Sequence, residues 1–152
     1  MKAEDTNSSS PVATAYNDTP QADYDRRERQ KRRQRALVVD DNPDIADMLT
    51  IILRHEGYEV VAVYSASDAL GAAFTGHFDV IISDIGMPGM NGYELAQALR
   101  AMPEYSTVPI VAVTGFAMYD DRDRTLDAGF SAHLSKPIDP VSLTQLISHL
   151  GH

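Results

Sequence analysis

Residues 36–43 read Ala-Leu-Val-Val-Asp-Asp-Asn-Pro, and this stretch decides the fold. Its first four residues form a continuous β-prone apolar run, as in a strand that is covered on both faces. Asn42 and Pro43 then make an N-cap and first-turn pair, after which Gly57 ends the helix. Between them lies a row of apolar residues at helical spacing: Ile45, Met48, Leu49, Ile52 and Leu53. The stretch therefore predicts a buried strand followed directly by a helix.

The same pattern recurs through the rest of the chain as short apolar runs alternate with helical periodicity. Predicted strands occupy residues 36–39, 59–63, 80–83, 110–113 and 132–135. Predicted helices begin at Pro43 and then occupy residues 66–74, 93–101, 118–128 and 140–150. Five strand–helix units in sequence indicate an α/β fold, because parallel neighbours require right-handed crossovers that place helices on both faces of a sheet.

Polar residues stand at the carboxyl ends of these strands, where parallel α/β sheets bind their ligands. They are Asp40 and Asp41 after the first strand, Asp84 after the third, Thr114 after the fourth and Lys136 after the fifth. Three carboxylates at one edge repel one another and raise their pKa values unless a cation lies between them. Oxygen ligands without His or Cys favour magnesium or manganese, so the pattern predicts a divalent cation.

The lysine and the threonine add groups that suit a phosphoryl ligand. Lys136 supplies a compact positive charge and Thr114 a hydroxyl donor. Taken singly, Asp40 and Asp41 fit a helix-capping loop, and Asp84 fits an Asx-turn. Capping gives no reason for acids at two strand ends, a hydroxyl at a third and a lysine at a fourth. The combination therefore predicts a phosphoryl-accepting pocket with a carboxylate nucleophile.

Four segments carry a resemblance to a known family: residues 37–42 (LVVDDN), 84–92 (DIGMPGMNG), 113–115 (VTG) and 135–137 (SKP). Through them residues 36–152 resemble the receiver domain of bacterial two-component response regulators. The resemblance implies a flavodoxin-like (βα)5 fold, a doubly wound parallel sheet of five strands in the order 2-1-3-4-5. It also implies a signalling module that catalyses only its own phosphorylation and dephosphorylation.

The resemblance implies a role for each residue of the pocket. Asp84 is the phosphoacceptor, and Mg²⁺, with Mn²⁺ as an alternative, is held by Asp40, Asp41, Asp84 and the backbone carbonyl of Gly86. Lys136 pairs with the phosphoryl group, and Thr114 is the switch hydroxyl that moves toward it. The Lys136–Pro137 peptide bond is expected to be cis.

Three positions depart from the usual family pattern. Gly115 follows the threonine, where alanine is commoner. His133 stands three residues before the lysine, where many members carry an aromatic switch residue, and it is interpreted either as a switch residue or as a half-solvated strand residue. Asn91 replaces an acid before the last glycine of the loop that follows Asp84, and we expect it to affect only turn geometry. The sequence therefore does not decide whether the usual coupling of the threonine to an aromatic side chain operates here.

The partners follow from the same resemblance. A histidine kinase or a histidine phosphotransfer protein would donate the phosphoryl group, docking on Ile45, Met48, Pro137 and Ile138. An unidentified downstream protein would read the changed surface. Only Gly151 and His152 follow the last predicted helix, so we expect a stand-alone receiver without an output domain. The alternatives are a phosphorelay intermediate, the receiver part of a hybrid sensor kinase, and a degenerate receiver that only binds protein.

Composition limits the other function classes. The chain lacks cysteine, which excludes disulfides and thiolate sites, and it has neither a signal peptide nor an apolar run of membrane-spanning length, so we expect a cytoplasmic protein. Residues 1–35 carry a net charge of +2 and the rest −11. We expect residues 1–35 to be a disordered leader. Its basic run, residues 26–35, is either a solvated segment or a contact for nucleic acid or an acidic partner. The acidic folded domain should repel nucleic acid.

Two enzyme-like classes share parts of this pattern. A flavodoxin-type FMN protein needs a phosphate loop rich in Ser, Thr and Gly after the first strand, whereas residues 40–44 here read Asp-Asp-Asn-Pro-Asp. A phosphatase of the haloacid dehalogenase type also uses an aspartate nucleophile, but in an Asp-x-Asp loop after that strand, which this chain lacks. A receiver is the interpretation that accounts for all five polar residues.

Overall fold

The computed structural model describes residues 20–21, 33–115 and 122–150. The chain divides into two compact units, Met1–Arg33 and Gln34–His152, and the second carries the fold. Most of the predicted leader and of its basic run lies outside the described residues. Arg35, counted with that run, is instead the first residue of a strand, where it forms an ion pair with Glu59 at 3.3 Å.

Strands and helices alternate through the second unit. The strands are β1 (Arg35–Val39), β2 (Glu59–Val63), β3 (Val80–Asp84), β4 (Ile110–Thr114) and β5 (Ala132–Ser135). The helices are α2 (Pro43–His55), α3 (Ala66–Thr75), α4 (Gly92–Arg100), α5 (Arg122–Ala128) and α6 (Pro140–Leu150), with a 3₁₀ turn, η2, at Pro103–Tyr105. In the part of the chain that is described, no helix is both long and apolar enough to cross a bilayer.

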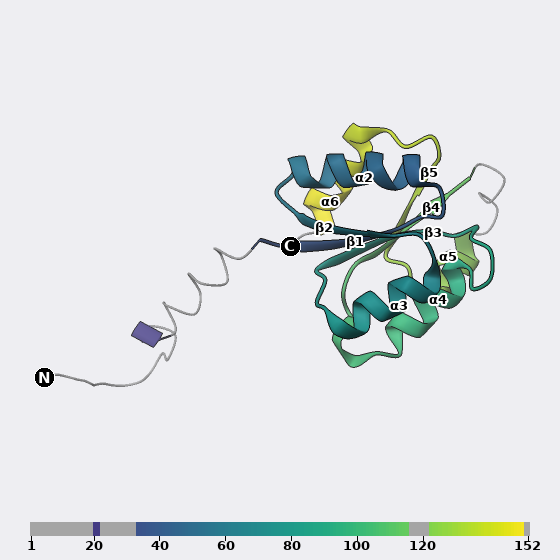
Figure 1. Cartoon of the computed structure of the whole chain (residues 1–152), viewed down its shortest axis with the longest axis horizontal. Helices are drawn as coiled ribbons and strands as arrows, with labels where there is room; N and C mark the ends of the chain where they lie inside the picture. Colours follow the sequence, from purple (N-terminus) through teal and green to yellow (C-terminus); the bar gives the residue numbers. More distant parts are fainter. Residues whose placement is uncertain (1–19, 22–32, 116–121, 151–152) are drawn as a thin grey trace, which may run out of the picture. The chain divides into compact units, whose positions relative to one another are not determined.

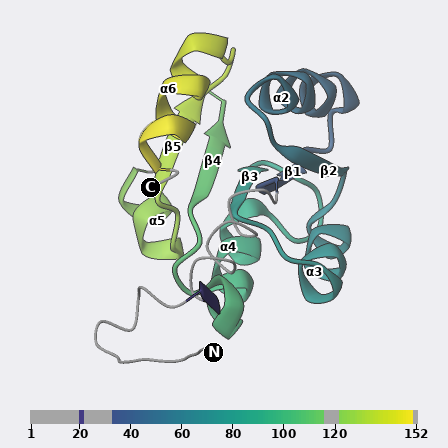
Figure 2. The same ribbon diagram turned by 90° about the vertical axis from the view of Figure 1, so that its left-hand side faces the viewer.

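The five strands form one parallel sheet in the order β2-β1-β3-β4-β5, as predicted (Figure 2). Helices α2 and α6 cover one face, and α3, α4 and α5 cover the other (Figure 1). Each face has its own hydrophobic core, and every residue of β3 and β4 is buried. The sheet therefore forms a rigid middle layer whose strand ends carry the polar residues.

Local signals explain where the first helix begins and ends. Asn42 has an extended backbone, and its side chain accepts the N–H of Asp44, so it caps α2 with Pro43 at the first helical position. At the other end, Gly57 adopts a φ of 98°, a left-handed conformation that glycine takes without strain. Both signals were read correctly from the sequence.

Several boundaries differ from the predicted ones. Strand β3 includes Asp84, so the acidic residue ends the ladder rather than following it. Asn91 does more than shape a turn: it caps α4, and Glu94 reciprocates by accepting the N–H of Asn91 at 3.0 Å. Of the helix predicted at residues 118–128, the structure describes the part from Arg122 as α5, and residues 118–121 lie outside the described residues.

Candidate functional site

Strand register brings the predicted site residues to one edge of the sheet. Val39 pairs with Ser83, so Asp40 and Asp84, one residue further along their strands, lie side by side. On the other side of β3, Asp84 pairs with Val113, which places Thr114 next to the same edge. Because all strands are parallel, their carboxyl ends meet there without any contribution from the loops.

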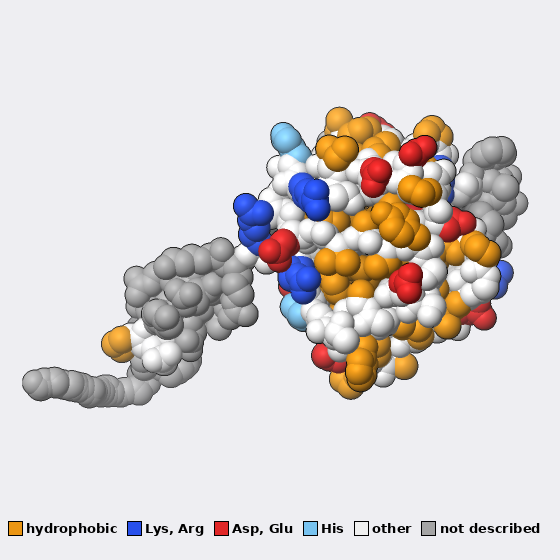
Figure 3. All heavy atoms as spheres, in the orientation of Figure 1, with side chains coloured by type: hydrophobic (Ala, Val, Ile, Leu, Met, Phe, Trp, Pro, Cys, Tyr) orange, Lys and Arg blue, Asp and Glu red, His pale blue; other side chains and the backbone are white. Residues whose placement is uncertain are grey.

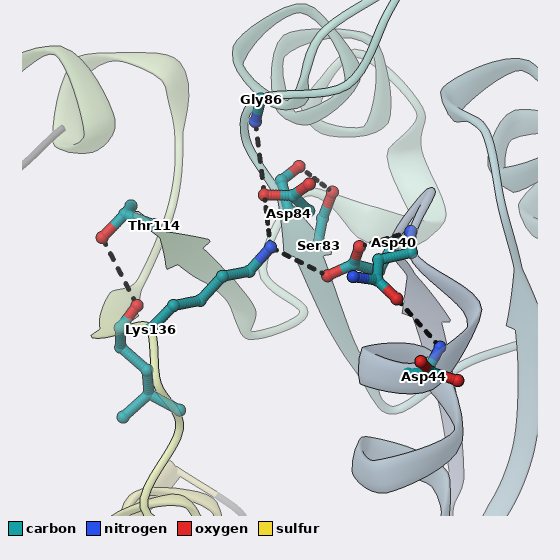
Figure 4. A network of polar contacts seen from close by, with 9 residues as sticks. Asp40, Asp44, Ser83, Asp84, Gly86, Thr114 and Lys136 are labelled. Carbon is teal, nitrogen blue, oxygen red and sulfur yellow. Dashed lines mark hydrogen bonds and ion pairs between the residues drawn. The ribbon is translucent and has the colours of Figure 1, made fainter. Parts of the chain in front are cut away.

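The ammonium group of Lys136 lies between two of the carboxylates (Figure 4). Its Nζ is 3.3 Å from Oδ2 of Asp40 and 3.4 Å from Oδ1 of Asp84. The Lys136 side chain is 26% exposed, whereas the carboxylates of Asp40 and Asp84 are nearly inaccessible. The Lys136–Pro137 peptide bond is cis, as expected. The lysine thus reaches inward from a loop at the surface and neutralises part of a buried negative charge.

A third carboxylate completes the acidic cluster. Asp40, Asp41 and Asp84 each offer one oxygen, and these oxygens lie within 4.8 Å of one another. Asp40 and Asp84 are buried, but Asp41 is exposed. One lysine against three acids leaves the cluster with a net negative charge, which a divalent cation at this point would offset.

Burial and a neighbouring charge both shift the pKa of Asp40. Burial raises the pKa of its carboxyl above the ordinary value of 3.8, and the nearby Asp84 carboxylate raises it further. The N–H of Asn42, which Oδ1 accepts at 2.9 Å, and the Lys136 ammonium lower that pKa in part. Burial and the like charge prevail, so the Asn42 N–H and the Lys136 ammonium compensate the ionised form of Asp40 only in part.

The donor set of this cluster fits a hard divalent cation. Oδ2 of Asp40 is buried and accepts no hydrogen bond from the described residues; its positive neighbour is the Lys136 ammonium. A buried carboxylate oxygen without a hydrogen bond is costly, and coordination to a cation would satisfy it. Since the candidate ligands are all carboxylate oxygens, magnesium or manganese fits better than zinc.

The backbone after Asp84 is packed tightly against its own continuation. The N–H of Gly86 donates to Oδ1 of Asp84 at 3.3 Å, and the N–H of Gly92 donates to the carbonyl of Ile85 at 2.9 Å. A Cβ atom at Gly92 would lie 2.5 Å from the Asp84 carbonyl oxygen. Residues 84 to 92 therefore form a closed loop that returns to its start, and glycine is required where the chain meets itself.

Thr114 is near the acidic cluster, but its hydroxyl points elsewhere (Figure 4). It is buried on β4 and donates to the carbonyl of Leu134 on β5 at 3.4 Å, which is near the upper limit for a hydrogen bond. His133, the neighbour of Leu134, has an exposed side chain on β5. The structure thus places the two predicted switch residues on adjacent strands at different depths.

The four predicted docking residues differ in accessibility. Ile45 and Met48 are partly buried along α2, and Pro137 is exposed in the loop after β5. Ile138 is 8% exposed and packs into the core that also contains Leu143. Met48 and Pro137 can therefore touch a partner, whereas Ile138 supports the loop from below.

Two residues that position Asp84 were not singled out from the sequence. One is Gly92, whose tight approach becomes visible only when the loop is closed. The other is Ser83, whose hydroxyl donates to the carbonyl of Asp84 at 2.9 Å. Glycine at the end of a Gly-rich stretch was the available signal for the first; nothing in the sequence distinguishes the serine.

Comparisons with known proteins agree with this geometry. The family model for the response regulator receiver domain matches residues 36–148. An uncharacterised 14.6 kDa protein of Leptolyngbya boryana is 39% identical over 111 residues, which is 73% of this chain and 85% of that protein. The DNA-binding response regulator MtrA of Mycolicibacterium smegmatis is 40% identical over 111 residues, also 73% of this chain, and the match spans 47% of MtrA.

A solved structure has the same fold. It is the receiver domain of the sensor histidine kinase PA1611 from Pseudomonas aeruginosa, described with a magnesium ion coordinated in the active site cleft. Its sequence is 31% identical to this one. The TM-score is 0.72, and the match covers 78% of this chain and 98% of that domain. With a family match over most of the second unit, the chain belongs to the response regulator receiver domain family, whose members are phosphoryl-accepting signalling modules of two-component systems rather than conventional enzymes.

Proposed function

We propose that this protein accepts a phosphoryl group on Asp84 from a phosphohistidine of a histidine kinase or phosphotransfer protein. The observation that carries the proposal is the meeting of three carboxylates and one ammonium group at a single sheet edge. This arrangement combines a nucleophile with groups that neutralise phosphoryl charge, which is what phosphoryl transfer to a carboxylate requires.

In the proposed step, a carboxylate oxygen of Asp84 attacks the phosphorus atom in line with the phosphorus–nitrogen bond of the phosphohistidine. The new oxygen–phosphorus bond forms as the phosphorus–nitrogen bond breaks, and the imidazole leaves with the electron pair and takes up a proton. The Lys136 ammonium, 3.4 Å from Asp84, shifts to the incoming phosphoryl oxygens and offsets their charge. Water then attacks the phosphorus atom, the bond between phosphorus and the Asp84 oxygen breaks, and inorganic phosphate leaves, which regenerates the Asp84 carboxylate.

We further propose that Mg²⁺, or Mn²⁺ in its place, is held by Asp40, Asp41, Asp84 and the backbone carbonyl of Gly86. When bound, the cation neutralises charge on the transferring phosphoryl group and orients it. Asp40 and Asp41 contribute by fixing two carboxylates beside the nucleophile. The related domain from Pseudomonas aeruginosa, with magnesium described in its cleft, supports this assignment.

The proposed signal starts at Thr114. Its hydroxyl would give up the 3.4 Å bond to Leu134 and donate to the phosphoryl group on Asp84 instead. Such a contact, made in one conformation and not in the other, gives the modification the differential free energy that it needs to shift a conformational equilibrium. Because Leu134 lies in β5, the change would be read at the surface formed by α5, β5 and α6, with His133 on that strand.

The proposal is tested by incubating the full chain with acetyl phosphate and magnesium chloride and measuring its intact mass. We expect a population heavier by one phosphoryl group, which disappears on incubation at alkaline pH because acyl phosphates hydrolyse readily. A parallel sample with excess chelator should stay unmodified. An unchanged mass over a wide range of donor and magnesium concentrations would favour a degenerate receiver that only binds protein.

Asp40→Asn should stabilise the metal-free protein at neutral pH, on the order of 1 kcal/mol. Since the pKa of Asp40 is raised in the folded state, its protonated form favours folding below pH 3.8, and that contribution is lost as the pH rises through the raised pKa. The wild type and the variant should therefore have similar free energies of unfolding in acid. As the pH rises, the variant should become more stable than the wild type. Urea unfolding in chelator, from pH 3 to 8, measures the difference.

The same variant separates folding from cation binding. Adding magnesium chloride should stabilise the wild type clearly and Asp40→Asn much less, because one of the proposed ligands has lost its charge. If Asp40→Asn is less stable than the wild type in chelator at pH 7, the inference that the Asp40 charge is only partly compensated is wrong.

Met48→Asp should abolish rapid phosphotransfer from a cognate kinase while leaving phosphorylation by acetyl phosphate intact. Met48 lies on the flank of α2 near α6, where a charge would disrupt apolar docking. The matched control is Ile51→Asp, on the outer surface of the same helix at 68% exposure, which should transfer normally. Equal loss of both reactions in Met48→Asp would refute the docking role.

A place within a phosphorelay is the second candidate. The receiver domain of a sensor histidine kinase is among the similar structures, which favours a role in which the phosphoryl group passes on to another protein. Phosphorylated protein mixed with a histidine phosphotransfer protein would then lose its label to the histidine faster than to water. Loss to water alone would favour direct signalling.

A further inference from the structure

Strand β2 has an open edge. It pairs with β1 on one side, and along its other side lies no strand of the described residues. The N–H of Glu59 donates to Gln34 and the carbonyl of Val63 accepts from Asp40, so the odd-numbered residues of β2 direct their backbone groups toward β1. By alternation, the N–H and C=O groups of Val60 and Ala62 point outward.

This edge lacks the usual protection. Edge strands are commonly blunted by lysine, proline, a bulge or a very short length. Strand β2 has five residues, and the four after Glu59 are Val, Val, Ala and Val. The opposite edge strand, β5, has four residues and carries exposed His133 and Ser135. Of the two edges of the sheet formed by the described residues, the β2 edge is therefore the one that offers a continuous apolar strand for pairing.

The surface around the edge is also apolar. Figure 3 views the molecule from the β2 side and shows hydrophobic side chains gathered between α2 and α3. Residues 60–63 are only partly buried, and Tyr64, which follows them, is 46% exposed. This set, residues 60–64, is called the β2 strip below.

Helix α2 lines one side of the β2 strip with charges of opposite sign. Its buried row faces the sheet and consists of Ala46, Leu49 and Leu53. A second row, with Met48 at its centre, packs toward the core that includes α6 residues. The row on the opposite flank, toward the strip, consists of Asp47, Thr50 and Arg54 at helical spacing.

Asp47 and Arg54 are two helical turns apart, so the flank is negative near the acidic cluster and positive near the start of β2. Both side chains are exposed, and neither forms an ion pair within the described part of the chain. A second copy approaching antiparallel places each negative end opposite a positive end. A parallel approach would instead set like charges against each other.

We propose that the β2 strip pairs antiparallel with the β2 strip of a second copy of this chain, about a twofold axis perpendicular to the sheet. The two sheets then continue as one sheet of ten strands, and the outward groups of Val60 and Ala62 gain partners. Because this axis is perpendicular to the sheet, the α2 faces of the two copies lie on the same side of the ten-stranded sheet. The two α2 helices therefore lie beside each other. Asp47 of each copy then faces Arg54 of the other.

Charge reversal tests the predicted contact by sedimentation equilibrium of the full chain from micromolar concentrations to about 1 mM. The wild type should shift from monomer to dimer with concentration. Asp47→Arg and Arg54→Asp should each weaken the dimer about tenfold or more, since like charges then face each other twice. The double variant carrying both changes should regain dimerisation to within about threefold of the wild type. A monomeric wild type at all concentrations, or a double variant as weak as the singles, overturns the proposal.

A backbone variant tests the pairing itself. Ala62→Pro removes an outward N–H that makes no bond to β1, so the monomer should fold while the dimer is lost. Ala62→Val keeps that N–H and should dimerise like the wild type. Circular dichroism and thermal unfolding confirm that the proline variant is folded. A folded proline variant that still dimerises excludes pairing through β2.

The proposal is independent of phosphorylation. The β2 strip lies along a strand edge and contains none of the residues proposed to bind the cation or the phosphoryl group. Asp84→Asn should therefore dimerise with the same affinity as the wild type. A dimer that requires Asp84 would point to another face and contradict pairing through β2.

Discussion

Asp84→Asn is expected to abolish phosphorylation: its intact mass should stay unchanged under conditions that modify the wild type. The reason is chemical, because the amide that replaces the carboxylate is a poor nucleophile toward phosphorus. Asp84 is the carboxylate that ends β3, and its Oδ1 is 3.4 Å from the Lys136 ammonium. Its backbone is held by the ladder to Val113, so no other acid can take its exact place.

Loss of folding cannot account for this result. Asp84 is buried next to Asp40, and removing one of two adjacent negative charges relieves repulsion. Asp84→Asn should therefore unfold at a urea concentration at least as high as the wild type does in chelator. Asp41→Asn is the graded control: it removes an exposed proposed ligand, so modification should slow but still occur. A phosphoryl adduct that persists in Asp84→Asn would reassign the acceptor.

Gly92→Ala is expected to destabilise the domain more than alanine at any other described glycine, by about 3 kcal/mol or more. The added Cβ would lie 2.5 Å from the Asp84 carbonyl oxygen and 2.6 Å from Cα of Ile85. Both are backbone atoms, so no side-chain rotation can relieve the overlap. The first turn of α4 or the end of β3 must shift, and the carboxylate of Asp84, the proposed phosphoacceptor, shifts with it.

The matched control is Gly71→Ala in the interior of α3. A Cβ at Gly71 meets nothing within 4 Å, and alanine is a better helix former, so this variant should gain about 0.5–1 kcal/mol. Urea unfolding of both variants and the wild type measures the changes in the free energy of unfolding. Acetyl phosphate labelling of Gly92→Ala at low temperature measures whether the shifted Asp84 still accepts a phosphoryl group. If Gly92→Ala lies within about 1 kcal/mol of the wild type, the loop is more compliant than its contacts imply.

The sequence predicted most accurately those features that a few neighbouring residues determine. Strands β2 and β5 and helix α6 have the predicted bounds, because alternating apolar runs and a helix-starting proline act over a few residues. The meeting of Asp40, Asp84 and Lys136 was also predictable, since it depends only on where parallel strands end. Strand order, by contrast, came from a resemblance and not from local pattern.

Features that depend on distant contacts escaped prediction. Turn η2 exists because Tyr105 is fully buried and its hydroxyl donates to the carbonyl of Ala73 at 2.9 Å, thirty-two residues away. The crowding at Gly92 and the orientation of the Thr114 hydroxyl likewise arise only when separate segments meet. No periodicity or composition in the neighbouring sequence encodes such contacts.

The unequal depth of the acidic cluster has a kinetic consequence. Asp40 and Asp84 are buried, but Asp41 is exposed, and Lys136, which lies between the carboxylates of Asp40 and Asp84, is partly exposed. A cation held by these residues would therefore be reached from solvent through the exposed Asp41 carboxylate, with the buried carboxylates of Asp40 and Asp84 behind it. Binding and release of such a cation would need no opening of the core, so occupancy of the proposed site would follow changes in the ionic medium far faster than the domain unfolds.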